Sequence, residues 1–582
     1  MVNLPLRPDA MTTEIVRTKL ETLGEEMLYL LYRSAYSTLM RETRDCSYRM
    51  TSPTGALVTD GAVNYQFAVE NLLNLHSFEE NDIWIANHPY QIGVQHTPDL
   101  MVIVPVFHNG THVAFSCATA HKSDSGGALV GSVSMLSTEI YQEGLLLPLM
   151  KLGESTESGY NLDDRIIRMI SANVRDPDLY IGDMRAQIGV TLVAKQRIQA
   201  LAESVGIETL LAVYGEILDH GERKMRRHLS EWEDGEITVE SFLDSDGITR
   251  DRPVRYELTV RKFGDSITLD FSGSDDQTTG PVNMLPPYME GFSIYPSLLA
   301  MTDPSALFNS GMRRPVSVIT REGSVLNPRL PAPVGATTTV AYRTTDLVLE
   351  ALGHFAPERA AANGGGAGGS TALLWRTPRG SKGSRAMQYE VLATAQGATN
   401  VSDGCSGTGA LFYNNPTTPI EILELQFPVR IERFELIKDS GGPGKQRGGL
   451  SYRREYRCLA PAMLNRRADR GKFPGKGIHG GKPGSVAKLF LNPDSESEQK
   501  VAIAGRYEFL AGESFMGEGA GGGGYGDPFA RDPHAVVRDV ALGYVSLDSA
   551  ETDYGVVFDK NGELDPAATA ERRQNGEITA TS

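Results

Sequence analysis

The stretch HTPDLMVIVPVFHNGTHVAFSCATAHKSD, residues 96–124, decides how the first half of this sequence folds. It contains two apolar runs, Leu100 to Phe107 and Val113 to Thr119, separated by the pair Asn109-Gly110. Apolar runs of this length are typical of buried strands, and an Asn-Gly pair between them is a strong short-range signal for a hairpin. The sequence therefore predicts a buried antiparallel hairpin.

An HxxD unit stands at each open end of this hairpin. His96 and Asp99 precede the first strand, and His121 and Asp124 follow the second. In an antiparallel hairpin the start of one strand lies beside the end of the other, so both units are expected at one edge of the sheet. A single HxxD unit occurs often by chance in a surface turn, but imidazole and carboxylate together are a common ligand set for Zn²⁺, Mn²⁺ or Fe²⁺. The pair of units therefore favours a divalent-metal site.

Acidic side chains on both sides of the hairpin are candidates for further roles. Glu42 and Asp45 lie upstream in the segment RETRD and could supply another carboxylate, although an ordinary charged loop is the simpler interpretation. Glu139 and Glu143 lie downstream in the segment STEIYQEG. Either could act as a general base or as the hydrogen-bond partner of a ligand histidine, although such residues more often cap a helix.

The rest of the chain predicts a mixed α+β fold with several subdomains. Apolar residues recur at helical spacing over residues 12–36 and, over a longer stretch, 181–230. Short strands and glycine-rich turns dominate after residue 236, interrupted by a helix around residues 345–355. We divide the chain into a helical and sheet region with the metal site at 1–235, a β-rich region at 236–565 and a polar, disordered tail at 566–582.

Composition excludes several classes of protein. The 56 basic and 73 acidic residues give a net charge of −17, which argues against binding to nucleic acid or to an anionic membrane. No run of 18 apolar residues and no signal-peptide pattern occurs. The four cysteines are widely separated and form no CxxC pair, as expected for reduced thiols in the cytoplasm. We expect a soluble, cytoplasmic chain.

The glycine clusters do not form a nucleotide site. Gly444-Lys445 is followed by Gln446, and Gly481-Lys482 by Pro483, so neither completes the phosphate-binding pattern GxxxxGK[ST]. No GxGxxG convincingly follows a strand, and no GxSxG elbow is present. The chain therefore offers no recognisable nucleotide site of its own.

Taken together, these motifs resemble those of the hydantoinase B and oxoprolinase family, which also includes subunits of acetone and acetophenone carboxylases. The resemblance extends over nearly the whole chain. The segments that carry it are RETRD at 41–45, NHPY at 87–90, HTPD at 96–99, AHKSDSGG at 120–127, STEIYQEG at 137–144, GDMRAQ at 182–187, FSGS at 271–274, GPVN at 280–283, DSGGPG at 439–444 and the glycine-rich run 521–528.

The resemblance implies a metal set of His96, Asp99 and His121, with Glu42 or Asp45 as a fourth ligand. This chain departs from many relatives in three places. Lys122 replaces a second histidine, Val94-Gln95 stands in a segment that is commonly Gly-Gly-Thr, and the segment NYQF at 64–67 replaces one that contains histidine. These departures leave the metal set intact but predict a different substrate pocket.

The family also implies a two-component enzyme, with a heterotetramer as its expected form. A hydantoinase A-like partner subunit would bind ATP with Mg²⁺ and phosphorylate the amide oxygen of a hydantoin, oxoproline or lactam. This chain would hold Mn²⁺, Zn²⁺ or Fe²⁺ and complete ring opening, with Glu139 or Glu143 handling the proton. The alternatives are a subunit of an acetone- or acetophenone-type carboxylase and a non-catalytic scaffold subunit.

Overall fold

The computed structural model describes residues 8–375, 387–409, 411, 413 and 415–580. A six-stranded sheet, entirely antiparallel, lies in the N-terminal part with strand order β1-β4-β3-β2-β5-β6. Its predicted central hairpin is confirmed. The strands are β1 (Cys46–Thr51), β2 (Asp82–Ala86), β3 (Asp99–His108), β4 (Thr111–His121), β5 (Met150–Thr156) and β6 (Gly159–Leu162).

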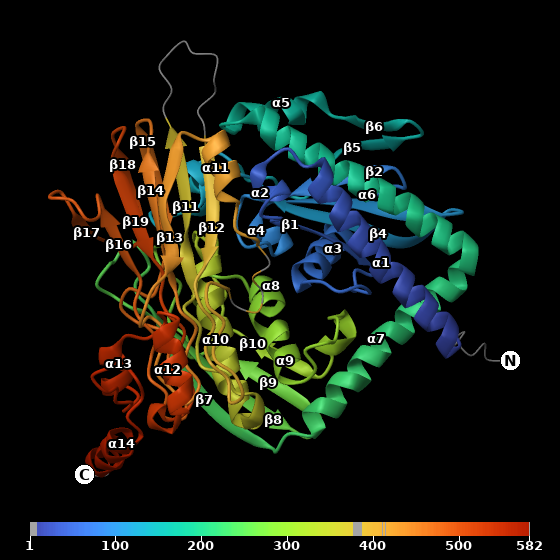
Figure 1. The fold of residues 1–582 in the computed structure, drawn as a ribbon. Helices are drawn as coiled ribbons and strands as arrows, with labels where there is room; N and C mark the ends of the chain where they lie inside the picture. Colours follow the sequence, from blue (N-terminus) through green and yellow to red (C-terminus); the bar gives the residue numbers. More distant parts are fainter. Residues whose placement is uncertain (1–7, 376–386, 410, 412, 414, 581–582) are drawn as a thin grey trace.

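Long helices cover one face of this sheet (Figure 1). Helix α1 (Ala10–Ser34) buries apolar residues at three- and four-residue spacing, as the sequence predicts. The helical stretch predicted at 181–230 consists of α6 (Pro177–Val205) and α7 (Ile207–Ser230). They are separated by Gly206, whose φ of 82° ends the first helix. The shorter helices of this part are α2 (Thr38–Arg41), α3 (Val63–Leu75), α4 (Pro89–Ile92) and α5 (Asp164–Asn173).

A second sheet and a central helix follow in the chain. The sheet has the order β10-β9-β8-β7, and α10 (Thr337–Phe355) packs against it. One apolar core joins this region to the opposite face of the first sheet, so residues on both sides of position 235 share it. The elements are β7 (Gly235–Leu243), β8 (Val254–Phe263), β9 (Ser266–Asp270), β10 (Val316–Ile319), α8 (Pro286–Met289) and α9 (Tyr295–Met301).

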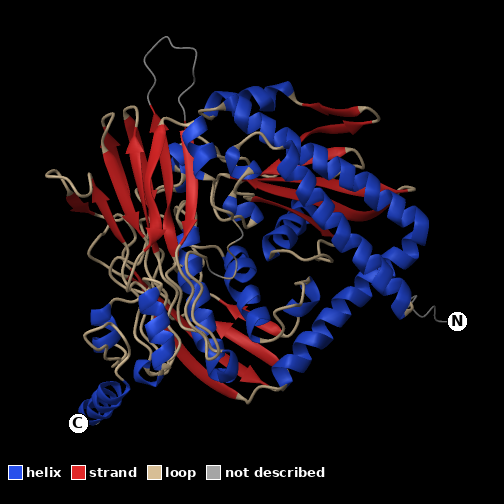
Figure 2. Ribbon diagram, in the orientation of Figure 1, coloured by secondary structure: helices blue, strands red, loops and turns tan. Residues whose placement is uncertain are grey.

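The C-terminal half is β-rich, as predicted, and contains two further sheets (Figure 2). The four-stranded sheet has the order β12-β11-β15-β18, and the five-stranded sheet has the order β13-β14-β19-β16-β17. Apolar side chains of both sheets form one core. The elements are β11 (Ala367–Trp375), β12 (Met387–Ala393), α11 (Ile420–Gln426), β13 (Val429–Leu436), β14 (Tyr452–Cys458), β15 (Ala462–Arg467), β16 (Lys488–Leu491), β17 (Gln499–Val501), β18 (Gly505–Phe509) and β19 (Ser514–Glu518).

The chain ends in helices α12 (Pro533–Ala541), α13 (Leu547–Thr552) and α14 (Pro566–Ala580). The stretch 566–580, predicted as a disordered tail, is thus helical. The hydroxyl of Thr569 accepts a hydrogen bond from the Val557 backbone at 3.0 Å, and Arg573 Nε donates one to the Tyr554 carbonyl at 3.0 Å. These contacts attach the start of α14 to the preceding segment, which a polar composition alone does not reveal.

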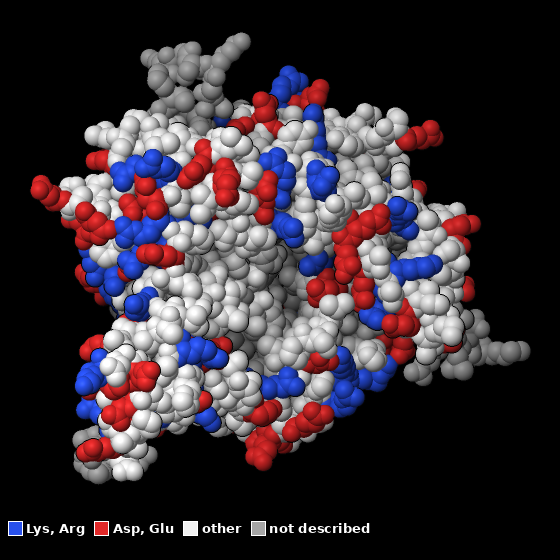
Figure 3. All heavy atoms as spheres, viewed as in Figure 1, with Lys and Arg blue, Asp and Glu red and all other residues white. Residues whose placement is uncertain are grey.

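The mixed α+β class with several subdomains is confirmed. Acidic and basic side chains are interspersed over the face seen in Figure 3, which is hollowed between the β-rich part and the N-terminal part. Charged groups gather around this hollow, while its visible walls carry few of them. In the described ranges, no helix has the combination of length and apolar character needed to cross a membrane.

Candidate metal centre

The register of the central hairpin brings two predicted ligands together. Asp99 begins β3, His121 ends β4, and their Cα atoms are paired across the ladder. His96 lies in the turn before β3, where its Nε2 is 3.7 Å from Asp99 Oδ2. One ligand atom from each of these three side chains lies within 4.8 Å of the other two. The predicted hairpin therefore assembles a compact group of two imidazoles and one carboxylate.

These three side chains are buried, and His121 lacks the hydrogen-bond partners that burial normally requires. His96 is 0% and His121 2% exposed, and neither ring nitrogen of His121 has a hydrogen-bond partner in the described structure. Burial lowers the pKa of His121 to about 3 and that of His96 well below its usual value. Both rings are therefore neutral, as metal ligands must be. Because an unsatisfied buried polar group costs free energy, the set fits a divalent cation that would accept these lone pairs.

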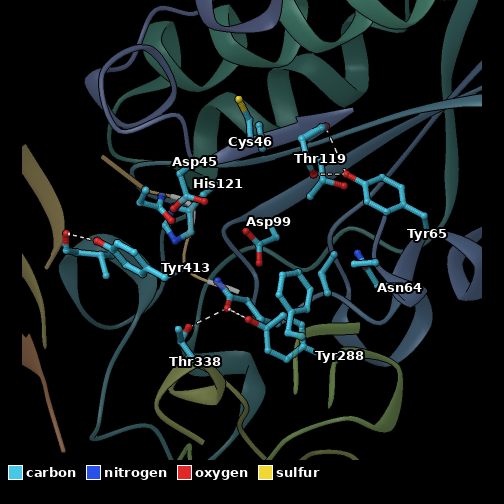
Figure 4. A pocket seen from close by; sticks show the side chains of 18 of the residues that line it. Asp45, Cys46, Asn64, Tyr65, Asp99, Thr119, His121, Tyr288, Thr338 and Tyr413 are labelled. Carbon is cyan, nitrogen blue, oxygen red and sulfur yellow. Dashed lines mark hydrogen bonds between the residues drawn. The ribbon is translucent and has the colours of Figure 1, made fainter. Parts of the chain in front are cut away.

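The orientation of His96 is held from both sides. Its Nδ1 is 3.3 Å from the carbonyl oxygen of Gly335, and its Nε2 is 3.0 Å from the side-chain amide of Gln95. The Gln95 carbonyl oxygen accepts hydrogen bonds from Tyr288 at 2.6 Å and Thr338 at 2.8 Å (Figure 4). A hydrogen bond from Nδ1 to a backbone carbonyl makes Nε2 the lone-pair nitrogen, which accepts from the Gln95 amide and is the atom that a bound ion would take.

Asp99 and His121 open onto a cavity of about 170 Å³. Asp45 also lines it, beside His121, whose backbone N–H donates to the Asp45 carbonyl at 3.1 Å (Figure 4). Burial raises the pKa of the Asp45 carboxyl to about 6. The ring of Tyr389 stacks on His121 with centroids 4.9 Å apart. The wall is otherwise rich in aromatic and amide groups, namely Asn64, Tyr65, Gln95, Tyr288, Phe292, Tyr342, Tyr413 and Asn415.

Two residues of the second HxxD unit lie away from this cavity. Asp124 pairs with Arg175 at 2.7 Å and accepts backbone hydrogen bonds from Gly126 and Gly131. It therefore stabilises a turn and does not converge with the first unit, contrary to the expectation that both units meet. Lys122, next to His121, points to the opposite side of the sheet, where its Nζ donates to Gln187 of α6 at 2.5 Å. The departure at position 122 thus lies outside the cavity.

The three candidate glutamates do not line the cavity. Glu42 pairs with the exposed Arg41 at 2.9 Å, and Glu139 is exposed. Glu143 is buried, and its carboxylate accepts hydrogen bonds from the backbone N–H groups of Val334 at 3.0 Å and Gly335 at 2.8 Å. Burial raises the pKa of Glu143 to about 8. Glu143 therefore holds the loop whose carbonyl contacts His96.

Replacing Glu143 by alanine is expected to weaken metal binding about tenfold, since partners that orient ligand histidines typically contribute 10- to 100-fold. The loss of the carboxylate oxygens, which accept hydrogen bonds from two backbone N–H groups, would free the Gly335 loop and with it the His96 ring. Glu143→Gln should recover part of the affinity, because its amide oxygen can still accept one of these bonds. Competition with a chelator measures the affinity, and Glu157→Ala in an exposed turn is the control. Unchanged affinity in Glu143→Ala would exclude this role.

Local sequence patterns miss several residues of this cavity. Thr338 belongs to α10, Tyr389 to β12 and Arg467 to β15, all more than 200 positions after the hairpin. The one usable signal is strand alternation within the segment NRR at 465–467, which sends neighbouring arginines to opposite faces. The packing of the sheets decides which of these two neighbouring arginines points into the cavity.

Comparison with known proteins places the site in a family context. The family model described as Hydantoinase B/oxoprolinase matches residues 9–528. The caprolactamase subunit beta of Pseudomonas jessenii is 30% identical, over 97% of this chain and 99% of its own length. The crystal structure of the ATP-dependent caprolactamase from the same organism is 28% identical, covers 97% of this chain and 100% of that one, and superposes with a TM-score of 0.88. The acetophenone carboxylase delta subunit of Aromatoleum aromaticum (strain DSM 19018 / LMG 30748 / EbN1) is 26% identical over 83% of this chain and 75% of its own.

Proposed function

Because this chain belongs to the hydantoinase B/oxoprolinase family, we propose that it is the metal-carrying subunit of an ATP-dependent enzyme that opens cyclic amides. The observation that carries the proposal is the buried group of His96, Asp99 and His121 at the edge of a small cavity, in which both ring nitrogens of His121 lack a partner among the described residues. Asp45, the other carboxylate on that wall, is the proposed fourth ligand. The similarity to a caprolactamase subunit supports a cyclic amide as the substrate.

The reaction has a demanding first step, because resonance stabilises the amide and its nitrogen leaves poorly. A partner subunit transfers a phosphoryl group from ATP to the amide oxygen, which makes the ring carbon electrophilic. Water then adds to this carbon, the carbon–nitrogen bond breaks, and the nitrogen takes a proton. The resulting acyl phosphate reacts with a second water to give a carboxylate and inorganic phosphate.

The residues of the cavity have distinct tasks in this scheme. His96, Asp99 and His121 would hold a divalent ion, which supplies Lewis acidity next to the reacting carbon. The aromatic wall, including Tyr288 and Tyr389, would exclude bulk water and pack against the ring of the substrate. Glu143 is assigned a positioning role through Gly335, in place of the proton transfer that the sequence suggested for Glu139 or Glu143.

The phosphorylation step requires a second chain. The relatives named above as subunits support a hetero-oligomer, and we propose an ATP-binding hydantoinase A-like subunit as the partner, in a heterotetramer. Mn²⁺, Zn²⁺ and Fe²⁺ all accept an imidazole–carboxylate set, so each is a candidate ion. The cytoplasm, with its ATP, is the proposed location.

The test is a co-expressed complex with the partner, assayed for ADP release against hydantoin, 5-oxoproline and caprolactam. We expect ADP release that depends on one of these cyclic amides and proceeds without bicarbonate. Ring-opened product, detected by mass spectrometry, should match ADP in amount. ADP release without a ring-opened product would contradict the proposal.

A carboxylase is the second candidate, favoured by the similarity to an acetophenone carboxylase subunit. Acetone and acetophenone serve as its test substrates. Turnover of either ketone that requires bicarbonate, together with inert cyclic amides, would assign the chain to this second activity. Retained amide turnover after complete metal removal would instead support a scaffold role.

A further inference from the structure

A buried arginine lines the cavity and forms no ion pair with any carboxylate of the described residues. Arg467, at the end of β15, is 3% exposed, and its Nη1 donates to the Gly335 carbonyl at 3.1 Å. Within the described ranges it forms no ion pair, whereas Arg343, Arg454 and Arg470, equally buried, each bind a carboxylate. A guanidinium has five N–H donors, and burial without a counter-charge is costly. Most of the donors of Arg467 are therefore left for something other than a carboxylate of the described chain.

Arg467 lies next to the candidate metal ligands. The Gly335 carbonyl that accepts its hydrogen bond is the same oxygen that contacts His96 Nδ1 at 3.3 Å. A ligand held by this guanidinium would thus sit beside the atoms that contact the ion.

The charges on the cavity wall leave room for an anion. Arg49 and Arg467 are its two permanent cations, and Asp45 and Asp99 are its carboxylates. Arg49 Nη1 donates to the Tyr48 carbonyl at 2.7 Å, while its Nε is buried without a partner. With an ion bound, carboxylate ligands are ionised and imidazole ligands are neutral, so the two carboxylates offset the two arginines. A divalent ion on the ligands therefore leaves a surplus of two positive charges.

We propose that Arg467, with Arg49 as a second cation, forms an oxyanion subsite that holds the phosphoryl group of the activated substrate. A dianionic phosphoryl group matches the surplus charge, and the planar guanidinium fork matches the geometry of phosphate oxygens. The inference rests on the proposed function, in which the phosphoryl group stays on the reacting carbon until the acyl phosphate is hydrolysed. A carboxylate carried by the substrate ring has the same oxyanion chemistry and is the alternative occupant.

The experiment titrates inorganic phosphate and, separately, acetate into the metal-loaded chain by isothermal titration calorimetry. It compares wild type with Arg467→Met, which keeps the volume and removes the charge. Arg261→Met, which removes an exposed arginine of β8, is the matched control. Metal content and circular dichroism are recorded for every protein. Arg467→Lys, which keeps the charge and loses the fork, serves as a second variant if the methionine variant does not fold.

We expect phosphate to bind wild type and Arg261→Met equally, and to bind Arg467→Met about tenfold more weakly or worse, since hydrogen bonds to charged groups are the strong ones. The phosphate affinity of Arg467→Lys should lie between those of wild type and Arg467→Met. Tighter binding of acetate than of phosphate, lost in the same variants, would keep the oxyanion subsite and assign it to a substrate carboxylate. Equal phosphate affinity in wild type and Arg467→Met, or no binding of either anion, would overturn the subsite.

The design separates this inference from the proposed function. A wild-type protein that contains no metal would contradict the metal centre, whatever the result for phosphate binding. Normal metal content with phosphate binding that ignores Arg467 would contradict only the subsite. In chelator-treated protein, phosphate should bind more weakly, because the surplus positive charge disappears; unchanged affinity there would also count against the charge balance that supports the subsite.

Discussion

Replacing His121 by alanine is expected to remove the bound divalent ion and to abolish cyclic-amide turnover. His121 supplies one of only two imidazoles in the group, and its ring nitrogens have no other partner in the described part of the chain. With His121 lost, His96 is the one imidazole left beside Asp99 and the proposed ligand Asp45, and a set with a single imidazole holds Zn²⁺ or Fe²⁺ less well. Elemental analysis of purified protein should give about one metal per chain in wild type and almost none in the variant.

The matched control for this prediction is His534→Ala, since His534 is exposed at the start of α12 and far from the hairpin in sequence. It should retain wild-type metal content and turnover. Binding of the partner subunit, measured by co-purification, should be retained in His121→Ala, because the fold of the sheet does not depend on this side chain. Full metal content in His121→Ala would contradict the assignment of the centre.

Replacing Glu390 by alanine is expected to destabilise the chain by about 3–5 kcal/mol, the usual effect of breaking a buried ion pair by removing one partner. The Glu390 side chain is fully buried, with Arg454 Nη1 at 3.0 Å and the Tyr456 hydroxyl at 2.7 Å. Truncation leaves the Arg454 guanidinium buried between the rings of Phe434 and Tyr456 with no counter-charge. Urea unfolding followed by circular dichroism should show a clearly lower midpoint.

Glu390→Gln is the informative companion, because it keeps an acceptor and removes the charge. It should lower the unfolding midpoint by less than Glu390→Ala. Glu236→Ala, which breaks an exposed ion pair with Arg261, should leave the midpoint nearly unchanged. If Glu390→Ala and Glu236→Ala have the same midpoint, the buried pair contributes no more than the surface pair, contrary to the prediction.

Much of the candidate site could be predicted from the sequence because its geometry is local. The Asn109-Gly110 turn and two apolar runs predict an antiparallel hairpin, which brings Asp99 and His121 to the same edge of the sheet. Their direct pairing also depends on a register shift between Val106 and Phe107, which the sequence did not reveal. His96 follows from its position three residues before Asp99. The long helices were likewise predictable, since their apolar spacing does not depend on distant partners.

What the sequence did not determine depends on contacts between distant segments. Asp124 has the same spacing to its histidine as Asp99, yet Arg175 from the loop before α6 draws it into a turn. Glu143 and Glu139 have the same side chain, and the tertiary structure alone separates their roles. The Glu143 carboxylate binds the backbone N–H groups of Val334 and Gly335, whereas Glu139 is exposed.

The sequence by itself therefore determined the hairpin, the three side chains proposed as metal ligands and the family. The tertiary structure decided what surrounds them: Thr338 hydrogen-bonded to Gln95, Tyr389 against His121, and Arg467 at the cavity wall, which has no ion pair among the described residues. The physical reason is the range of the forces involved. Strand register and turn chemistry act over a few residues, whereas the cavity wall arises where separate sheets bury their apolar faces against one another, and no local pattern encodes that packing.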